Sequence, residues 1–428
     1  MFYRRSPETT LRSPVSRHKV RLLFGARQTG KTALLQHLLA GEATRFFDLQ
    51  EPALRRRLEA DPGVLTREIR ALPRHLHTVV LDEIQKVPAL LDEVQGLYDS
   101  APSRWQFYLT GSSARQLRVR AANLLPGRSH VYHLFPVCRW EMVRATSPAI
   151  GPPGARRRRR PRAPGGTRAQ RRARRPAAAA PPFPQHGLTR LLLLGCLPGV
   201  YSENPSTARA TLEAYVGHYL EEEIRREALV RDLGPFVVFL RLAATESGQP
   251  VNLAKLSQES GVPASTLKSY YQVLVDTFVG HWVPPHARHT RKRLLTTPRF
   301  LFFDAGVRNA AAEIPLRPPL SDAVGGGMLE HWVGQELIAR AGYAGRGHRV
   351  SYWRTATGAE VDYVWESPRE DVPIEVKWTA KPRPADARHL ETFLDLHADR
   401  ARRGLVVCRC EHAQQLTERV RAIPWHSL

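Results

Sequence analysis

The chain has 428 residues, of which 42% are hydrophobic; this composition excludes a mainly disordered or fibrous protein, and the length predicts roughly two to four domains. The formal net charge of +24 excludes an acidic protein and favours polyanionic partners such as DNA, because basic side chains release the counterions that surround a nucleic acid. The four cysteines form no CxxC pair and no apolar run approaches the ~20 residues of a membrane helix, so we expect a cytoplasmic protein without disulfides or membrane contact.

Residues 1–147 alternate short apolar runs with amphipathic stretches, which is typical of a parallel sheet with crossover helices. The expected strands are Val20–Phe24, Thr44–Asp48, Thr78–Leu81, Gln106–Leu109 and His130–Leu134. Five such strands are enough for a nucleotide-binding core, so the predicted fold class of this part is α/β, as in P-loop NTPases.

A glycine-rich motif stands between the first expected strand and the helix that follows it. Its residues match GxxxxGK[ST] in full and are Gly25, Ala26, Arg27, Gln28, Thr29, Gly30, Lys31 and Thr32. Glycines let the backbone wrap around phosphates, and the amide groups at the start of the helix point at the anion. We expect Lys31 to reach the β and γ phosphates of ATP and the Thr32 hydroxyl to bind Mg²⁺; a chance glycine-rich turn is the alternative.

Two carboxylates end a later buried strand, in Val79-Val80-Leu81-Asp82-Glu83. Asp82 is expected to hold Mg²⁺ through water and Glu83 to polarise the attacking water, although acids at this place also occur simply in the first turn of a helix. Ser112, after the next strand, stands where a side chain would sense the γ-phosphate. Arg128 precedes the last strand, either as an arginine finger for a neighbouring subunit or as a solvated surface side chain.

Residues 148–182 differ in composition from the rest of the chain. Eleven arginines and no acidic residue lie between Ile150 and Pro182, among Pro, Ala and Gly. Such a segment cannot bury enough apolar surface to fold, so we predict a disordered linker. A nucleic-acid-binding arm and the translated frame error of a GC-rich gene stay open as alternatives.

Residues 183–231 are predicted to form a helical lid or connector, with an apolar stripe along Thr207–Val230. Residues 232–310 have the spacing of a winged-helix module, with helices at Leu253–Glu259 and Pro263–Asp276 and strands at Val279–Pro284 and Arg299–Phe303. The basic loop between the two strands is expected to contact DNA phosphates through Arg288, Arg291, Lys292 and Arg293. A protein-interaction module with a solvated basic loop is the alternative.

Residues 325–428 are predicted to form a separate α/β domain with a helix at Met328–Ala341, a second helix near Ala385–Ala398, and strands at Arg349–Arg354, Glu360–Glu366, Val372–Lys377 and Gly404–Cys408. Asp362 lies on the expected strand that precedes the one with Glu375-Val376-Lys377. Glu375 and Lys377 share a face of their strand, because successive side chains point to opposite faces. With Glu336 from the preceding helix, these residues suggest a second metal site, since Mg²⁺-dependent phosphodiester cleavage uses an acid pair and a lysine. The alternative is a retained fold in which the charges form a buried ion-pair network.

Together these motifs resemble a known family, the prokaryotic AAA-superfamily P-loop ATPases that carry a C-terminal domain of unknown function with a PD-(D/E)xK nuclease-like fold. The matching stretches are GARQTGKTALLQHLL, VVLDEIQKVPALLDEVQ, FYLTGSSARQL, LPGRSHVYHLFP, GCLPGVY, FLFFDAGVRNA, MLEHWVGQEL, WRTATGAEVDYV and PIEVKW. The resemblance implies nucleotide and Mg²⁺ roles for Gly25, Gly30, Lys31, Thr32, Asp82 and Glu83, with Arg128 as a further candidate. The chain departs from the family at 148–182, where the resemblance implies an ordinary helical segment.

The sequence therefore predicts a Mg²⁺-dependent ATPase of AAA type that acts on, or is gated by, DNA or a protein partner, with homo-oligomerisation as a further expectation. Two alternatives remain: a metal-dependent nuclease regulated by ATP, and a nucleotide-switched module that binds DNA or protein without hydrolysis. ATP turnover with and without duplex DNA, scored together with cleavage of that DNA in Mg²⁺ or Mn²⁺, separates the three.

Overall fold

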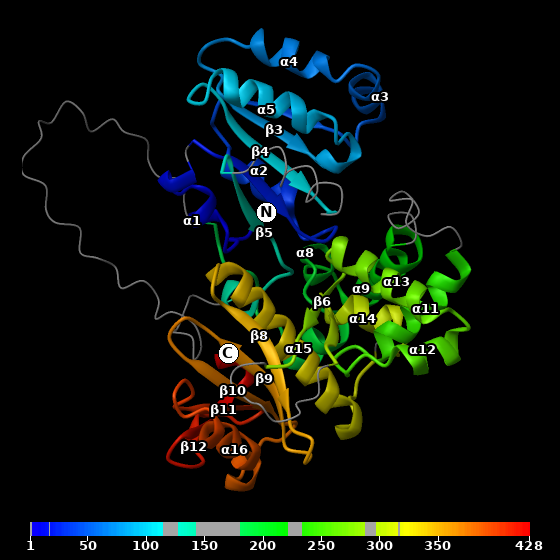
Figure 1. The fold of residues 1–428 in the computed structure, drawn as a ribbon, viewed down its shortest axis with the longest axis vertical. Helices are drawn as coiled ribbons and strands as arrows, with labels where there is room; N and C mark the ends of the chain where they lie inside the picture. The colour runs from blue at the N-terminus through cyan, green and yellow to red at the C-terminus, as the bar shows by residue number, and fades with distance from the viewer. Residues whose placement is uncertain are drawn as a thin grey trace, which may run out of the picture.

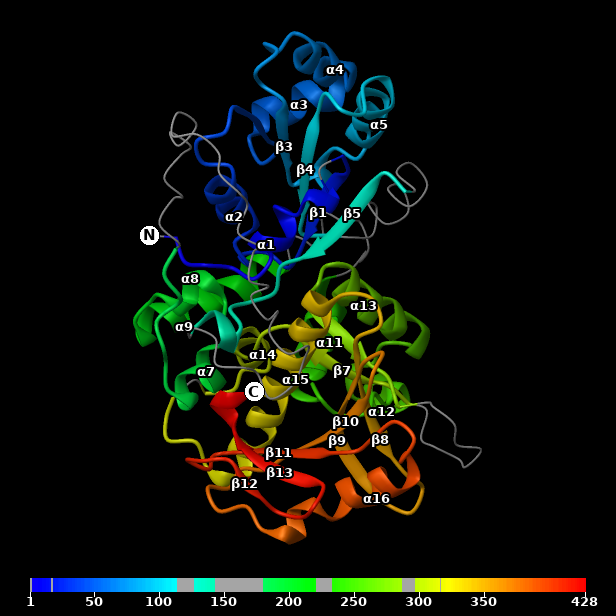
Figure 2. The same cartoon turned by 90° about the vertical axis from the view of Figure 1, so that its left-hand side faces the viewer.

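A computed structural model of the chain describes residues 2–16, 18–113, 127–142, 180–220, 233–286, 297–315 and 317–428. The expectations for residues 148–179 and for Arg288, Arg291, Lys292 and Arg293 lie outside these residues. Figures 1 and 2 show a parallel sheet at one end of the molecule and a mixed sheet at the opposite end, joined through a group of helices.

The N-terminal sheet has five parallel strands in the order β2-β3-β4-β1-β5. The strands span Val20–Phe24 (β1), Thr44–Asp48 (β2), Thr78–Asp82 (β3), Gln106–Gly111 (β4) and Ser129–His133 (β5). All five predicted strands are confirmed, with β3 and β4 extending further and β5 beginning one residue earlier. The helices of this part are α1 (Glu8–Leu11), α2 (Lys31–Leu38), α3 (Pro52–Ala60), α4 (Gly63–Arg70) and α5 (Leu90–Ser100). Because β3, β4 and β1 are parallel neighbours, the residues that follow them meet at one edge of the sheet.

Short helices follow the N-terminal sheet along the chain. They are α7 (Leu188–Leu194), α8 (Pro198–Tyr201) and α9 (Pro205–Ala214), followed by a π-helical stretch at Tyr215–Leu220. The Asn204 side chain caps α9 by accepting the backbone N–H groups of Ser206 and Thr207, so this helix begins two residues before the predicted Thr207. The remainder of the predicted helix, to Val230, lies outside the described residues.

A three-helix unit with a small sheet comes next. It comprises α11 (Leu233–Thr245), α12 (Leu253–Ser260), α13 (Ala264–Asp276) and the antiparallel strands β6 (Gly280–Val283) and β7 (Arg299–Phe302), after which α14 (Ala305–Ala311) follows. Gly261 ends α12 with a φ of 69°, in the left-handed region that favours glycine. Leu267, Tyr270 and Leu274 of α13 are buried, and aromatic contacts such as Tyr271 against Phe300 join the helix to the sheet.

The C-terminal sheet has six strands in the order β12-β13-β11-β10-β9-β8. Its elements are α15 (Asp322–Ala344), β8 (Arg349–Arg354), β9 (Glu360–Glu366), β10 (Asp371–Val376), α16 (Arg388–Leu396), β11 (Gly404–Cys408), β12 (Gln414–Gln415) and β13 (Val420–Pro424). The predicted elements are confirmed, with α15 longer at both ends, α16 shorter at both ends, and two further strands, β12 and β13. Strands β8, β9 and β10 are antiparallel, whereas β11 runs parallel to β10.

Alternate side chains of this sheet belong to two different hydrophobic clusters. Tyr363 and Trp365 of β9 join the main core, which includes residues of α15, whereas Val364 joins the cluster that contains Phe393 of α16. Since successive side chains of a strand point to opposite faces, α15 and α16 cover opposite faces of the sheet. The main core also contains Leu22 and Leu81 of the N-terminal sheet. Within the described ranges, no helix has both the length and the apolar content needed to span a bilayer.

Candidate functional site

The motif at residues 25–32 forms the connection between β1 and α2, at the carboxyl edge of the parallel sheet. Gly30 caps α2 with a φ of 91°, a conformation that residues with side chains rarely adopt. Gly25 has a different reason to be glycine, because a Cβ there would lie 2.3 Å from the carbonyl oxygen of Leu134. The backbone of the loop is thus shaped by its two glycines, as the motif predicts.

Lys31 lies inside this loop and is 5% exposed. Its Nζ donates to the carbonyl oxygens of Gly25 at 3.0 Å and Ala26 at 3.1 Å. The same ammonium lies 3.6 Å from Oε1 of Glu83. A buried positive charge therefore stands where the loop would receive phosphate, near the Glu83 carboxylate that follows β3.

Asp82 joins three elements at this edge. Its Oδ2 accepts the hydroxyl of Thr32 at 2.6 Å, and its Oδ1 accepts the hydroxyl of Thr110. Thr110 lies on β4, beside β3, and its Oγ1 also accepts the backbone N–H of Glu83 at 2.9 Å. Burial raises the pKa of Asp82 above its ordinary value, although the two hydroxyl groups oppose this. The run Thr110-Gly111-Ser112-Ser113 predicts small hydroxyl groups near the γ-phosphate, and the structure shows that Thr110 bonds to Asp82 and to the Glu83 backbone.

Glu83 is held by side chains on both sides. Its Oε2 accepts the hydroxyl of Ser112 at 2.7 Å, and Gln85 donates to the same oxygen at 2.5 Å. Burial by itself would raise the pKa of Glu83, but the Lys31 ammonium and these two donors outweigh it, so the pKa falls below its ordinary value. A carboxylate with a lowered pKa, beside a lysine and within reach of the loop, is suited to orienting a water molecule.

Other contacts to the loop come from distant segments that the sequence did not single out. Arg5 donates to the carbonyl oxygen of Thr29 at 2.7 Å, and the Tyr215 hydroxyl donates to the carbonyl of Arg27 at 3.4 Å. Of the remaining predicted loop side chains, Thr29 is buried and bonds to the Ala26 carbonyl, whereas Gln28 is exposed with a φ of 60°. No local sequence signal marks Arg5 or Tyr215, because their contacts depend on the tertiary fold.

Arg128 lies at the other end of the sheet. It precedes β5, whose first residue pairs with Val20 at the start of β1, whereas the loop follows the end of β1. Its guanidinium forms an ion pair with Asp99 at 2.7 Å and is about a third exposed. Arg128 therefore takes no part in the site of its own chain, and any role as an arginine finger is directed at another subunit.

In the C-terminal domain, the predicted trio meets on neighbouring strands. Oδ2 of Asp362 on β9 accepts the backbone N–H of Val376 at 2.7 Å, and Lys377 Nζ donates to Oε1 of Glu375 at 2.7 Å. Burial next to Asp362 raises the pKa of Glu375 to about 7. Oε2 of Glu375 is buried without a hydrogen-bond partner among the described residues.

The inclusion of Glu336 in this group was wrong, and Glu330 takes its place. Burial and the neighbouring Asp362 raise the pKa of Glu330 to about 8. The two glutamates stand six residues apart on α15, which is about 9 Å along the helix and about 240° around it, so both cannot face one sheet. Glu336 turns to the N-terminal part instead, where both carboxylate oxygens accept the backbone N–H of Arg139 at 3.0 Å.

The acidic cluster of Glu330, Asp362 and Glu375 also contains a buried cation. Arg299 of β7 is 3% exposed and donates to Oε1 of Glu330 at 3.1 Å and to a carboxylate oxygen of Glu360. A guanidinium so placed neutralises part of the acidic charge and ties the cluster to the preceding module.

A further group was not predicted because its members come from separate elements. His286, Glu366 and Asp371 place possible ligand atoms within 4.8 Å of one another, and His286 Nε2 lies 3.3 Å from Asp371 Oδ2. Each carboxylate is already paired with an arginine, Glu366 with Arg349 and Asp371 with Arg400. These ion pairs compensate the charge without a metal, so we assign the group a structural role.

Residues 17–143 match a family described as an AAA domain. Residues 185–317 and 325–428 match two families that are each described as a domain of unknown function.

Similar proteins include two that are described as uncharacterised, from Mycobacterium bovis and Mycobacterium tuberculosis. Each is 24% identical over 423 residues, which covers 98% of this chain and 83% of the relative. Among solved structures, a Walker-type ATPase of Pyrococcus abyssi is 15% identical and covers 73% of this chain and 96% of its own, with a TM-score of 0.45, too low to show a shared fold. The N-terminal part of this chain is therefore similar to AAA domains, and its parallel sheet with a glycine-rich loop after β1 agrees with that similarity.

Proposed function

We propose that the protein binds ATP with Mg²⁺ at the loop of residues 25–32 and hydrolyses it. The observation that carries the proposal is the convergence of Lys31, Thr32, Asp82 and Glu83 at one edge of the sheet, with the 2.6 Å bond between Thr32 and Asp82. Hydroxyl and carboxylate oxygens are the ligands that Mg²⁺ prefers. These two residues would hold the ion, which when bound would neutralise charge on the phosphates.

The protein residues divide the work of hydrolysis. The loop amides and the Lys31 ammonium bind the β and γ phosphates, and Glu83 orients the attacking water. The water oxygen bonds to the γ phosphorus, the bond from that phosphorus to the β-γ bridging oxygen breaks, and the water protons pass to phosphate or solvent. ADP and phosphate then leave.

Two substitutions test this proposal in the purified protein. Lys31→Ala should abolish nucleotide binding or turnover, whereas Glu83→Gln should retain ATP but stop hydrolysis, because it removes the charge that orients water and spares the loop. Lys19→Ala is the matched control, since Lys19 precedes β1 at the opposite end of the strand. Unchanged nucleotide affinity in Lys31→Ala would contradict the assignment.

We further propose that the module of α11, α12, α13, β6 and β7 is a winged helix that contacts DNA. Its helix order and antiparallel strand pair support this, and Lys268, Ser269 and Gln272 on α13 are exposed. Replacing Lys268 and the loop residues Arg288, Arg291, Lys292 and Arg293 by alanine should weaken duplex binding and reduce its salt dependence. Unchanged DNA affinity would favour a protein partner instead.

The acidic cluster supports a second candidate function, metal-dependent phosphodiester cleavage regulated by ATP. The buried, unpartnered Oε2 of Glu375, beside Asp362 and Glu330, favours it. The ion pairs of Arg299 with Glu330 and Glu360 favour a structural network instead, and we propose that the network is the main role. Incubation of the protein with duplex DNA in Mg²⁺ or Mn²⁺ distinguishes the two.

A further inference from the structure

Arg5 lies outside the glycine-rich motif but is bonded to it. Its side chain is buried, and Nη1 donates to the Thr29 carbonyl at 2.7 Å. Nε donates to the carboxylate of Glu141 at 3.2 Å, and Nη2 donates to the Phe135 carbonyl at 2.5 Å. One guanidinium thus joins the loop to the segment 135–141, which follows β5.

The bond to Thr29 fixes the direction of one peptide group in the loop. In a trans peptide the C=O and the following N–H point in opposite directions. Holding the Thr29 carbonyl therefore turns the Gly30 N–H away from Arg5. Gly30 is the N-cap of α2, where backbone amides bind phosphate. Arg5 thus orients part of the phosphate cradle from outside it.

Arg5 also bonds to the Glu141 carboxylate, which accepts one backbone N–H from the residue after Arg5 and one from the segment 135–141. Oε1 of Glu141 accepts the backbone N–H of Ser6 at 2.6 Å, and its Oε2 accepts the backbone N–H of Cys138 at 3.1 Å. Both oxygens of a buried carboxylate are therefore engaged. A displacement of Arg5 must therefore move this segment or break charge-assisted hydrogen bonds, which are stronger than neutral ones.

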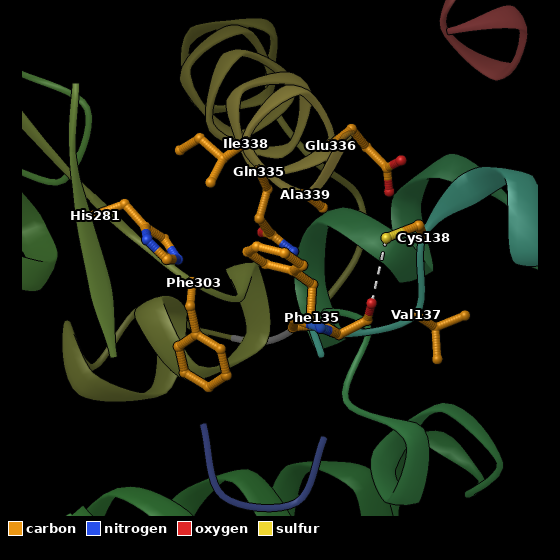
Figure 3. A pocket seen from close by; sticks show the side chains of 10 residues that line it. Phe135, Val137, Cys138, His281, Phe303, Gln335, Glu336, Ile338 and Ala339 are labelled. Carbon is orange, nitrogen blue, oxygen red and sulfur yellow. Dashed lines mark hydrogen bonds between the residues drawn. The ribbon is translucent and has the colours of Figure 1, made fainter. Parts of the chain in front are cut away.

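The segment in turn contacts α15 along two turns of that helix. Arg139 bonds to Glu336, and the Phe135 N–H donates to the Tyr343 hydroxyl at 3.2 Å. Figure 3 shows Phe135, Cys138 and Glu336 among the side chains that line a small cavity between the segment and α15. The cavity measures about 10 Å³, near the space that one water molecule needs. The segment packs closely against α15, since a Cβ added at Gly342 of this helix would lie 2.5 Å from the Phe135 ring.

The same helix carries Glu330 of the acidic cluster, six residues before Glu336. We propose that Arg5 is a positioning residue that couples the phosphate-binding loop to α15 and, through this helix, to the acidic cluster. The inference rests on the nucleotide binding proposed above. Phosphate in the loop competes with the Gly25 and Ala26 carbonyls for Lys31 and draws the loop amides inward, which changes the Thr29 peptide that Arg5 holds.

The experiment uses the full chain with a non-hydrolysable ATP analogue and Mg²⁺. Analogue affinity and hydrogen exchange of the α15 amides are measured for wild type, Arg5→Lys and Arg12→Lys. Arg12 is the matched control because its guanidinium also donates to a carbonyl, that of Leu38 at 2.7 Å, but at the far end of α2. We expect the analogue to slow α15 exchange in wild type and in Arg12→Lys.

In Arg5→Lys, we expect analogue affinity to fall about tenfold, as the loss of one charge-assisted bond implies, and the α15 response to vanish even at saturating analogue. A lysine keeps the charge but cannot donate in three fixed directions. Tyr343→Phe, which removes one hydroxyl, should keep wild-type affinity and weaken the response, so the test does not depend on the folding of an Arg5 variant.

The outcomes separate the coupling from nucleotide binding itself. Wild type that fails to bind the analogue would overturn the proposed function and the coupling together. Binding without any α15 response, or an undiminished response in saturated Arg5→Lys or in Tyr343→Phe, would overturn the coupling alone.

Discussion

The substitution Gly25→Ala tests whether the conformation of the loop depends on the close approach of two backbones, that of Gly25 after β1 and that of Leu134 after β5. An added Cβ would lie 2.3 Å from the Leu134 carbonyl oxygen and 3.1 Å from Oγ1 of Thr29. Leu134 cannot easily yield, because its own N–H donates to the Phe24 carbonyl at 2.7 Å. One of the two backbones must therefore move by close to an ångström.

The expected cost follows from that displacement. Overpacking of this kind destabilises a protein by about 1–3 kcal/mol, and a shift of about 1 Å in groups that position a substrate lowers turnover by about 100-fold. Gly25→Ala should therefore lower the free energy of unfolding modestly and ATP turnover severely. Urea unfolding and a phosphate-release assay measure the two effects.

Gly96→Ala is the matched control. Gly96 lies on α5, and beyond the neighbouring backbone of its own helix no atom of the described residues lies within 4 Å of the added Cβ. Alanine should therefore stabilise the helix by about 0.5–1 kcal/mol and leave turnover unchanged. If Gly25→Ala unfolds at the wild-type urea concentration and hydrolyses ATP at the wild-type rate, the steric argument for the loop is refuted.

Three other predictions concern sites away from the loop. Asp362→Ala should destabilise the C-terminal domain by about 1–3 kcal/mol, because the Val376 N–H loses its acceptor. Wild type should show no robust cleavage of duplex DNA. Mn²⁺-dependent cleavage by wild type that is lost in a normally folded Asp362→Ala protein would instead show that the cluster is a nuclease site. Burial raises the pKa of Glu336 to about 7, so its contribution to stability is complete below the unfolded pKa of about 4.5 and is lost as pH rises through 7. By linkage, the free energy of unfolding of wild type, measured with urea, should fall by up to ~3 kcal/mol relative to that of Glu336→Gln between pH 4 and pH 8. If the free energies of the two proteins change in parallel with pH, this prediction is wrong. Arg128→Ala should leave ATP affinity unchanged but lower turnover at least about tenfold in an assembled protein, and full turnover at concentrations that favour assembly would exclude a finger role.

Much of the N-terminal domain could be predicted because its signals are local. A run such as Val20–Phe24 can be buried on both faces only as a central strand, and the glycine motif fixes the connection that follows it. The structure brings Lys31 near Glu83 and bonds Thr32 to Asp82. This proximity follows from the parallel order of β1, β4 and β3, whose carboxyl ends lie at one edge of the sheet.

The acidic cluster shows where such reasoning stops. Helical periodicity placed Glu330 and Glu336 on the same helix, but only the packing of α15 between two parts of the molecule decides which face meets the sheet. The prediction that Glu336 joins the cluster was wrong, because the sequence does not indicate that this glutamate accepts the backbone N–H of Arg139. Arg299 was likewise invisible, since it reaches the cluster from a different module.

The secondary-structure elements and the glycine-rich loop follow from the sequence alone, since strand burial, glycine conformation and motif spacing act over a few residues. Only the folded structure shows that Arg5 contacts the loop, that Arg128 lies away from the site of its own chain, and that Glu330 lies near Asp362. These facts depend on contacts between residues that are far apart in the chain, such as Arg5 and Glu141. Contacts of that kind are set by how whole elements pack, which no local pattern of residues specifies.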